Sequence, residues 1–176
     1  MALRNIFDMS DPILRKKSRT VTEFNERIFQ LLDDLNDTLT KIEGLGLAAP
    51  QVGILRRVAI VLIDEKDILE LVNPEILEKE GEVGIDEACL SCPGLIGYVI
   101  RPERIVVKAQ DRNGNEFTRE FEGLNARAVC HEVDHLEGIL FVDVAQSVHE
   151  DTEEYRAQQR KEEEEEEKAK QKEAKE

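Results

Sequence analysis

Apolar residues recur every three or four positions between residues 24 and 43. This spacing places them along one face of a helix, and Gly44 suits the helix end. The apolar positions are Phe24, Ile28, Leu31, Leu32, Leu35, Leu39 and Ile42. The pattern therefore predicts an amphipathic helix over residues 24–43 that packs one face against a core.

Runs rich in β-branched residues follow this helix. They cover residues 58–63 and 68–72. Asn73-Pro74 then interrupts, and residues 76–83 are a third candidate strand. Such runs are typical of strands, and an Asn-Pro pair favours a break between them. The sequence predicts three separate strands here and a further strand through residues 98–100.

A hairpin and a second helix are predicted in the next part of the chain. Residues 105–107 and 117–121 flank Asp111-Arg112-Asn113-Gly114-Asn115, whose Asn-Gly pair supplies the positive φ that such turns need. A helix is then predicted over residues 124–137, ended by Gly138. Short strands that do not alternate regularly with helices indicate an α+β fold with mainly antiparallel strands.

Composition and charge narrow the class of protein. The 176 residues carry a net charge of −15, which argues against a body that grips nucleic-acid backbone over a wide surface. No apolar run approaches the roughly 20 residues of a membrane-spanning helix. Residues 1–7 lack the basic start and apolar stretch of a signal peptide. We therefore expect a cytoplasmic protein with neither a membrane nor a specific nucleic acid as partner.

The last part of the chain differs in kind from the rest. Residues 162–167 are six consecutive glutamates, and from Glu150 onward only Tyr155 and a few alanines interrupt polar and charged residues. With no apolar face, this segment cannot join the core. A solvated helix and a partner-binding arm are both compatible with it. We expect one catalytic domain over residues 1–149 and a charged helical tail over residues 150–176.

The strongest chemical signal is the sequence HEVDH at residues 131–135, on the second predicted helix. Its two histidines are four positions apart, so both imidazoles lie on one helical face and can bind a single cation. Glu132 beside them can carry protons to and from water. Asp134 faces elsewhere and is expected to be a solvated or capping carboxylate, and His149 is expected to be a surface histidine.

A third metal ligand is needed, because catalytic sites usually have three protein ligands and one open position. The chain has three cysteines, and Cys130 is expected to be a packed thiol. One cysteine would complete an open catalytic site, whereas Cys89 and Cys92 together would close a structural zinc site. Glu132 has no purpose in a closed site, and Pro93 constrains the second thiol. A conventional HExxH metalloprotease would need a glutamate from the acidic tail as its third ligand.

A third segment, GLGLAAPQ at residues 44–51, contains two glycines that let backbone approach a ligand and ends in the amide of Gln51. Together, GLGLAAPQ, EACLS at residues 87–91 and HEVDHLEG at residues 131–138 resemble the three signature motifs of the peptide deformylase family, in order and in spacing. The resemblance covers roughly residues 1–148. Two positions depart from it.

The first departure is Ala88, which stands where the family usually has glycine, beside Cys89. The second is Cys130, which stands where glutamine usually precedes the first histidine, and which removes a side-chain amide from the surroundings of the metal ligands. Neither residue is itself a ligand.

The resemblance implies a metallohydrolase that removes the formyl group from the N-terminal formylmethionine of newly made polypeptides and releases formate. Cys89, His131 and His135 would hold one divalent ion, naturally Fe²⁺ and, after isolation, often Zn²⁺ or Ni²⁺. Glu132 would take a proton from the attacking water and pass it to the leaving amine. The partners implied are N-formylmethionyl nascent peptides. A ribosome is compatible with the sequence but not indicated by it, and we expect a monomer.

The resemblance also assigns the other site residues. The Gln51 side-chain amide and the Leu90 backbone N–H would stabilise the oxyanion. The substrate methionine would enter an apolar pocket of Leu45, Leu124 and Ala128. The Gly46 backbone would bind the peptide chain, and Glu87, also placed at the substrate site, would orient a ligand or loop. Arg101 would meet a peptide or a carboxylate, or be an ordinary exposed arginine.

Overall fold

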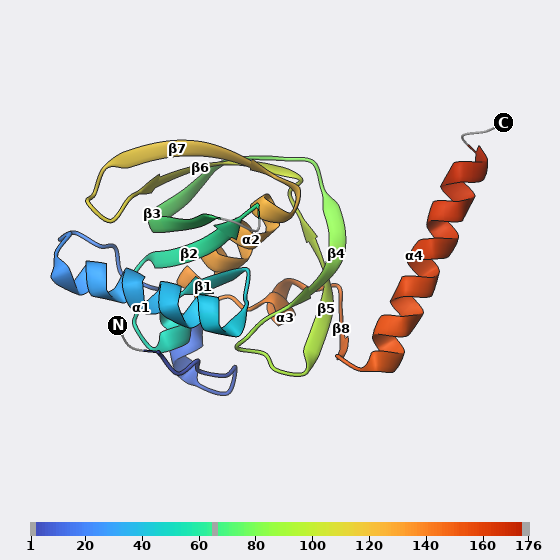
Figure 1. The fold of residues 1–176 in the computed structure, drawn as a ribbon, viewed down its shortest axis with the longest axis horizontal. Helices are drawn as coiled ribbons and strands as arrows, with labels where there is room; N and C mark the ends of the chain where they lie inside the picture. The colour runs from blue at the N-terminus through green and yellow to red at the C-terminus, as the bar shows by residue number, and fades with distance from the viewer. Residues whose placement is uncertain (1–2, 65–66, 174–176) are drawn as a thin grey trace.

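The described residues, 3–64 and 67–173 of a computed structural model, contain eight strands in two antiparallel sheets around a central helix (Figure 1). The five-stranded sheet has the order β1 (Gly46–Ala48), β2 (Val58–Ile63), β3 (Asp67–Glu80), β6 (Arg104–Gln110) and β7 (Glu116–Glu122). The three-stranded sheet has the order β4 (Val83–Ala88), β5 (Leu95–Arg101) and β8 (Ser147–Glu150). The helices are α1 (Glu26–Ile42), α2 (Gly123–Leu136), α3 (Phe141–Val144) and α4 (Glu153–Glu173), with 3₁₀ turns η1 (Pro12–Arg15) and η2 (Ala49–Val52). The α+β class is confirmed.

Helix α1 confirms the first predicted helix to within two residues. It begins after Asn25, whose side chain accepts a hydrogen bond from the Arg27 N–H at 3.1 Å. It ends at Glu43, which takes the left-handed conformation with φ 54°, one position before the glycine expected to do so. The apolar face buries leucines against β1 and β2, as the spacing predicted.

The expected break at Asn73-Pro74 is wrong. One strand, β3, passes through both residues, and the end of the third predicted run instead starts β4. Asn73 has φ 50°, and its side chain pairs with the backbone N–H and C=O of Val21 at 2.8 and 2.9 Å. The register of β3 on β6 shifts at this point. The Asn-Pro pair therefore forms a β-bulge within the strand. A proline is tolerated there because a bulge interrupts the regular hydrogen bonds, so its missing N–H is not needed.

The predicted hairpin and second helix are both confirmed. Strands β6 and β7 pair along their whole length, and Gly114 in the turn has φ 84°. The Asp111 carboxylate accepts hydrogen bonds from the N–H groups of Asn113 and Asn115 at 2.8 and 2.9 Å, which fixes the loop. Helix α2 packs mainly against the five-stranded sheet. Cys130 is buried in that interface, as expected of a packed thiol.

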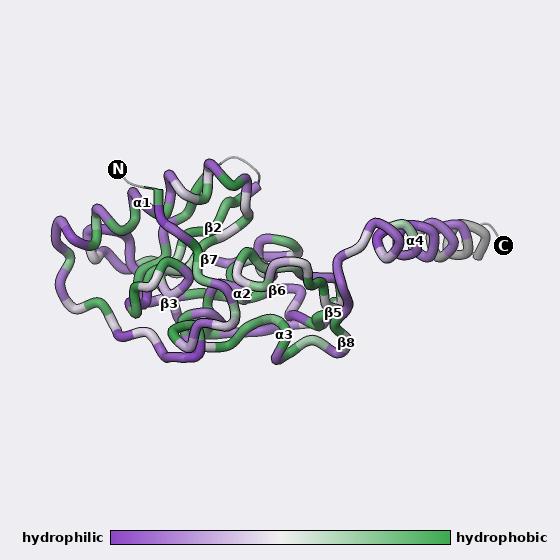
Figure 2. Tube along the Cα trace, turned by 90° about the horizontal axis from the view of Figure 1, so that it is seen from below, coloured by the Kyte–Doolittle hydropathy of each residue, from purple (hydrophilic) through white to green (hydrophobic). Residues whose placement is uncertain are grey.

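The charged tail is helical, as predicted, and α4 stands away from the body (Figure 1). Where Figure 2 colours this helix, most of it is purple, the hydrophilic end of the scale. The expected domain boundary between residues 149 and 150 falls inside β8, which pairs with β5. At the root of α4, the Tyr155 hydroxyl donates to Asp86 at 3.1 Å, and its ring stacks on His149, which is exposed as expected. In the described part of the chain, no helix is both long and apolar enough to cross a membrane.

Candidate metal centre

A pocket of about 520 Å³ brings the three sequence segments together. It opens between β1, the end of β4 and helix α2. Its lining includes Gly46 and Gln51 from the first segment, Cys89 and Leu90 from the second, and His131 and Glu132 from the third. The three segments, which are far apart in the sequence, therefore line one cavity, as expected if they contribute to a single site.

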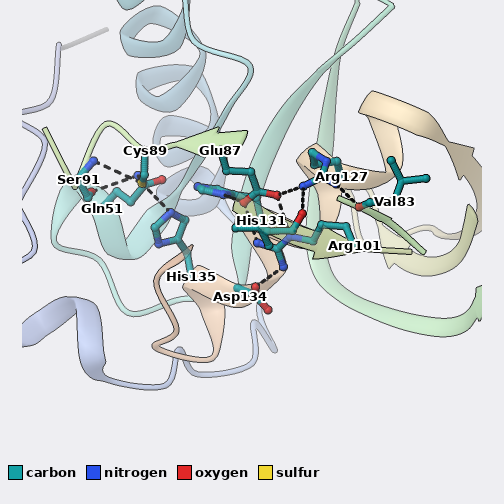
Figure 3. A network of polar contacts seen from close by, with 11 residues as sticks. Gln51, Val83, Glu87, Cys89, Ser91, Arg101, Arg127, His131, Asp134 and His135 are labelled. Carbon is teal, nitrogen blue, oxygen red and sulfur yellow. Dashed lines mark hydrogen bonds and ion pairs between the residues drawn. The ribbon is translucent and has the colours of Figure 1, made fainter. Parts of the chain in front are cut away.

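Three ligand atoms converge beside this pocket. The ligand atoms of Cys89, His131 and His135 all lie within 4.8 Å of one another, and within the described ranges they form the one such group of cysteine, histidine and acidic side chains. Cys89 Sγ lies 3.3 Å from His135 Nε2. A dashed line in Figure 3 marks this contact. Cys89 directly follows β4. The two histidines are four residues apart on α2, and this spacing places both on one face of the helix, as predicted.

The chemistry of this donor set fits a divalent transition metal. The neighbouring Cys92 thiol and burial raise the pKa of the Cys89 thiol, so a cation is needed to favour its thiolate. Burial and the nearby His131 lower the pKa of His135 well below its ordinary value. Its imidazole is therefore neutral, which is the form that binds metals. One thiolate and two imidazoles suit Fe²⁺, Ni²⁺ or Zn²⁺ better than Mg²⁺ or Ca²⁺.

Cys92 does not join the ligand group. Its thiol is 1% exposed and belongs to an apolar cluster with Leu14, Val99, Leu140 and Phe141. Its N–H donates to the Cys89 carbonyl at 2.9 Å, so the two cysteines occupy the first and last positions of one four-residue turn. The arrangement has three ligands and an adjoining cavity, unlike the closed four-ligand zinc site.

Glu132 is buried at the pocket wall, where one of its carboxylate oxygens has no hydrogen-bond partner within the described residues. The residue is 4% exposed, and this oxygen is Oε2. Burial raises the pKa of Glu132 to about 7. A buried carboxyl poised near neutrality, and aimed at a cavity beside metal-type ligands, is suited to taking up and releasing a proton.

A buried network of charged side chains holds His131 through its Nδ1 atom (Figure 3). Its Nδ1 lies 3.1 Å from Glu87 Oε2. Because a carboxylate only accepts, Nδ1 carries the hydrogen and Nε2 keeps its lone pair for a metal. Burial opposes ionisation of Glu87, but hydrogen bonds from His131 and Arg101 outweigh it and lower the pKa of Glu87 to about 2.

The same network corrects two expectations. Of the two alternatives for Arg101, the exposed arginine is wrong, since the residue is 7% exposed. It meets carboxylates instead: both oxygens of Glu87 at 2.9 and 3.0 Å, and Asp134 at 2.5 Å. Asp134 is thus paired with Arg101 instead of being merely solvated or capping. Sequence reasoning missed Arg127 altogether, although it stands four residues before His131 on the same helical face. Its guanidinium donates to Glu87 at 2.6 Å.

Gln51 is fixed at the pocket edge by η2. It is 2% exposed, and its Oε1 accepts from the Ala48 N–H at 2.9 Å. Its Nε2 donates to Ser91 Oγ at 3.2 Å and approaches Cys89 Sγ at 3.6 Å. The amide N–H₂ is therefore directed toward the ligand cluster, and this orientation depends on a backbone donor three residues earlier.

The remaining candidate residues also line the pocket. They are Leu45, Gly46, Glu87, Leu90, Leu124 and Ala128. Leu45 and Leu124 are 59% and 66% exposed and lie at its mouth, whereas Glu87 turns its carboxylate toward the arginines and His131. Ala88, the first departure from the motif, ends β4 beside Cys89 and lines the same cavity.

Comparison with known proteins decides the family. A sequence model described as polypeptide deformylase matches residues 3–151. The chain belongs to this family. The known activity of polypeptide deformylases is the deformylation of N-formylmethionine, and the family is metal-dependent.

Individual deformylases resemble the chain over most of its length. It is 57% identical to a peptide deformylase of Caldicellulosiruptor bescii, over 89% of this chain and 94% of that protein. A peptide deformylase structure from Legionella pneumophila aligns with a TM-score of 0.79 at 42% identity, covering 82% of this chain and 87% of the other. One from Thermotoga maritima aligns with a TM-score of 0.81 at 36% identity, covering 84% and 100%.

Proposed function

We propose that this chain hydrolyses the formyl group from N-terminal formylmethionine with Cys89, His131 and His135 as metal ligands and Glu132 as proton carrier. The observation that carries this proposal is the convergence of three ligand atoms beside a cavity that is also lined by Glu132, a buried residue with a carboxylate oxygen that is unpaired within the described part of the chain. Cys89 as third ligand and the open position beside it favour hydrolysis over a structural role.

The chain's own residues supply the proton transfers. When bound, a divalent ion supplies Lewis acidity and makes water a nucleophile near neutral pH. The Glu132 carboxylate takes the proton that water releases, and its burial favours this uptake because it raises the pKa of Glu132 to about 7. The protonated carboxyl then passes the proton to the leaving amine, which is the stronger base. Such acid–base catalysis contributes about 10²–10⁴-fold in rate.

Negative charge that develops on the formyl oxygen is stabilised by two donors. One is the Gln51 side-chain N–H, already oriented by its bond to Ala48. The other is the backbone N–H of Leu90, which follows Cys89 at the pocket wall. A donor fixed before the reaction costs no reorganisation, and each is worth about 3 kcal/mol in the transition state.

The pocket determines which amide reaches the site. Leu45, Leu124 and Ala128 receive the methionine side chain, and the Gly46 backbone binds the peptide. A formyl carbon carries only hydrogen, whereas an acetyl group adds a methyl that crowds the space beside Glu132. The substrate must present a chain end, so internal peptide bonds are excluded.

The proposal extends to the cellular setting. We infer Fe²⁺ as the natural ion, with Zn²⁺ or Ni²⁺ able to replace it, since a thiolate and two imidazoles suit each of them. The substrates are formylmethionyl nascent chains met in the cytoplasm, near the ribosome, by a monomeric catalytic domain of about residues 1–149.

Formate release from a short formyl-Met peptide tests this function, on protein prepared without oxygen and with its metal content measured. We expect rapid release from the formyl peptide, and release from the matched acetyl-Met peptide slower by at least 100-fold. Comparable rates on the two peptides, or cleavage of an internal bond, would contradict the proposal.

A further inference from the structure

The three candidate metal ligands come from two different packing units. Cys89 follows β4 in the three-stranded sheet, whereas His131 and His135 lie on α2. Helix α2 packs mainly against the other, five-stranded sheet. The spacing between the cysteine and the histidines therefore depends on whatever fastens the small sheet to α2.

A group of buried polar contacts connects the three-stranded sheet to α2 (Figure 3). From α2, Arg127 donates to the carbonyl of Val83 at 2.5 Å in β4 and to the carbonyl of Val99 at 3.0 Å in β5. It also bonds Glu87 in β4 at 2.6 Å. One side chain thus holds two strands of the small sheet and the carboxylate that orients His131.

The geometry of α2 makes Arg127 and His131 a pair. They are four residues apart, on one helical face, and both contact Glu87. Arg127 bonds Oε1 and His131 bonds Oε2, so the carboxylate bridges them. Arg101 approaches the same carboxylate from β5. Among the described residues of α2, its direct partner is Asp134, whose side chain is 24% exposed.

Arg127 is buried, so its hydrogen bonds matter more than those of an exposed arginine would. The residue is 8% exposed, and a guanidinium so placed is costly unless its N–H groups are bonded. Replacing it removes the hydrogen bonds to the carbonyls of Val83 and Val99 and leaves Glu87 with one cation fewer. The small sheet and the imidazole of His131 would then shift relative to each other.

We propose that Arg127 is a positioning residue that fastens the sheet carrying Cys89 to the helix carrying His131 and His135 and so sets the spacing of the metal ligands. This inference rests on the proposed metal site. It predicts that removing Arg127 weakens metal binding and alters the coordination geometry while the two sheets remain folded. Loss of an outer partner of a metal-ligating histidine typically costs about 10–100-fold in metal affinity.

The experiment compares wild type, Arg127→Met and Arg127→Lys after reconstitution with Co²⁺. Visible absorption reports the thiolate–cobalt band and the coordination geometry, and competition with a chelator reports affinity. The matched control is Arg104→Met, since Arg104 also has several acidic partners, Glu78, Glu80 and Glu120, but outside the site. Thermal unfolding of the metal-free proteins checks that each variant is folded.

We expect Arg127→Met to bind Co²⁺ about 10–100-fold more weakly with a shifted spectrum. Arg127→Lys, which keeps the charge but not the forked donors, should be intermediate, and Arg104→Met should match wild type. Glu87→Gln combined with Arg127→Met should cost less than the product of the single effects, because both act through one carboxylate. Wild-type affinity and spectrum in both Arg127 variants would overturn the inference, and Arg127→Lys decides it alone if Arg127→Met does not fold. Absence of a thiolate–cobalt band in wild type would instead refute the metal site itself, and the inference with it.

Discussion

The Glu132 carboxylate lies directly against the backbone of Gly46. A Cβ atom on Gly46 would lie 2.4 Å from Glu132 Oε1 and 2.8 Å from its Cδ. The first glycine-rich segment is thus packed onto the candidate proton carrier, so the absence of a side chain at position 46 lets Glu132 occupy its place at the pocket wall.

Gly46→Ala should therefore displace Glu132 and little else. We expect kcat to fall at least 10-fold, within the range that acid–base catalysis contributes, while the protein stays folded and keeps its metal. Steady-state kinetics and metal analysis on the purified variant measure this. An unchanged kcat would show that the close approach has no bearing on the reaction.

The two cysteines of the second segment should respond differently to substitution. Cys89→Ala removes a ligand and should abolish stoichiometric metal binding. Cys92→Ala truncates a side chain packed against Leu14 and Phe141, so it should cost about 1–3 kcal/mol of stability and keep the metal. Metal content and thermal unfolding of both variants separate these effects. Loss of metal in both would restore the closed four-ligand site.

The iron form should be sensitive to oxygen. Cys89 is 9% exposed and lines an open pocket, so peroxide can reach both the thiolate and the metal. Zinc has no accessible redox change, so the zinc form should be inactivated more slowly in air. Activity half-lives of the two forms, prepared from the same batch, provide the measurement; equal decay would leave the proposed iron–thiolate site unsupported.

The tail gives a prediction that depends on where the chain is cut. Helix α4 is solvated, and its ion pairs, such as Glu164–Lys168 at 3.5 Å, lie at the surface, where they add little stability. A chain ending at Thr152 should keep kcat/KM on a short formyl-Met peptide within about threefold of wild type. A chain ending at Gln146 also loses β8, and with it the Asp151 N–H bond to the Gly94 carbonyl at the pocket wall.

The second truncation should be the destabilised one, because it exposes the edge of β5. Unfolding temperatures and kcat/KM for the two chains, measured side by side, check this. A tenfold fall in kcat/KM on ending at Thr152 would mean that α4, through Tyr155 and Asp86, supports the active site.

Local patterns were enough to predict the parts of the site that are close in sequence. The HExxH spacing places His131 and His135 on one face because helical geometry depends only on residue separation. The hairpin at Gly114 and helix α1 were predictable for the same reason: turn chemistry and apolar periodicity are local.

The buried network around Glu87 could not be predicted in this way. It joins residues 87, 101, 127 and 134, which only the packing of the small sheet on α2 brings together. The sequence left two alternatives open for Arg101, a contact with a peptide or carboxylate and an exposed position, because arginine is seldom buried without several partners. The break expected at Asn73-Pro74 failed for a related reason: Val21, remote in sequence, bonds the Asn73 side chain and keeps the strand continuous.

Glu132→Gln tests the central claim most directly, with metal content and formate release measured on the same sample. The amide side chain has nearly the same size as the carboxylate it replaces, and Glu132 is not among the converging ligand atoms, so the variant should retain one metal ion per chain. An amide cannot accept and return a proton, so formate release should fall by about 10²–10⁴-fold. Metal lost in parallel with activity, or activity close to wild type with the metal retained, would contradict the role assigned to Glu132.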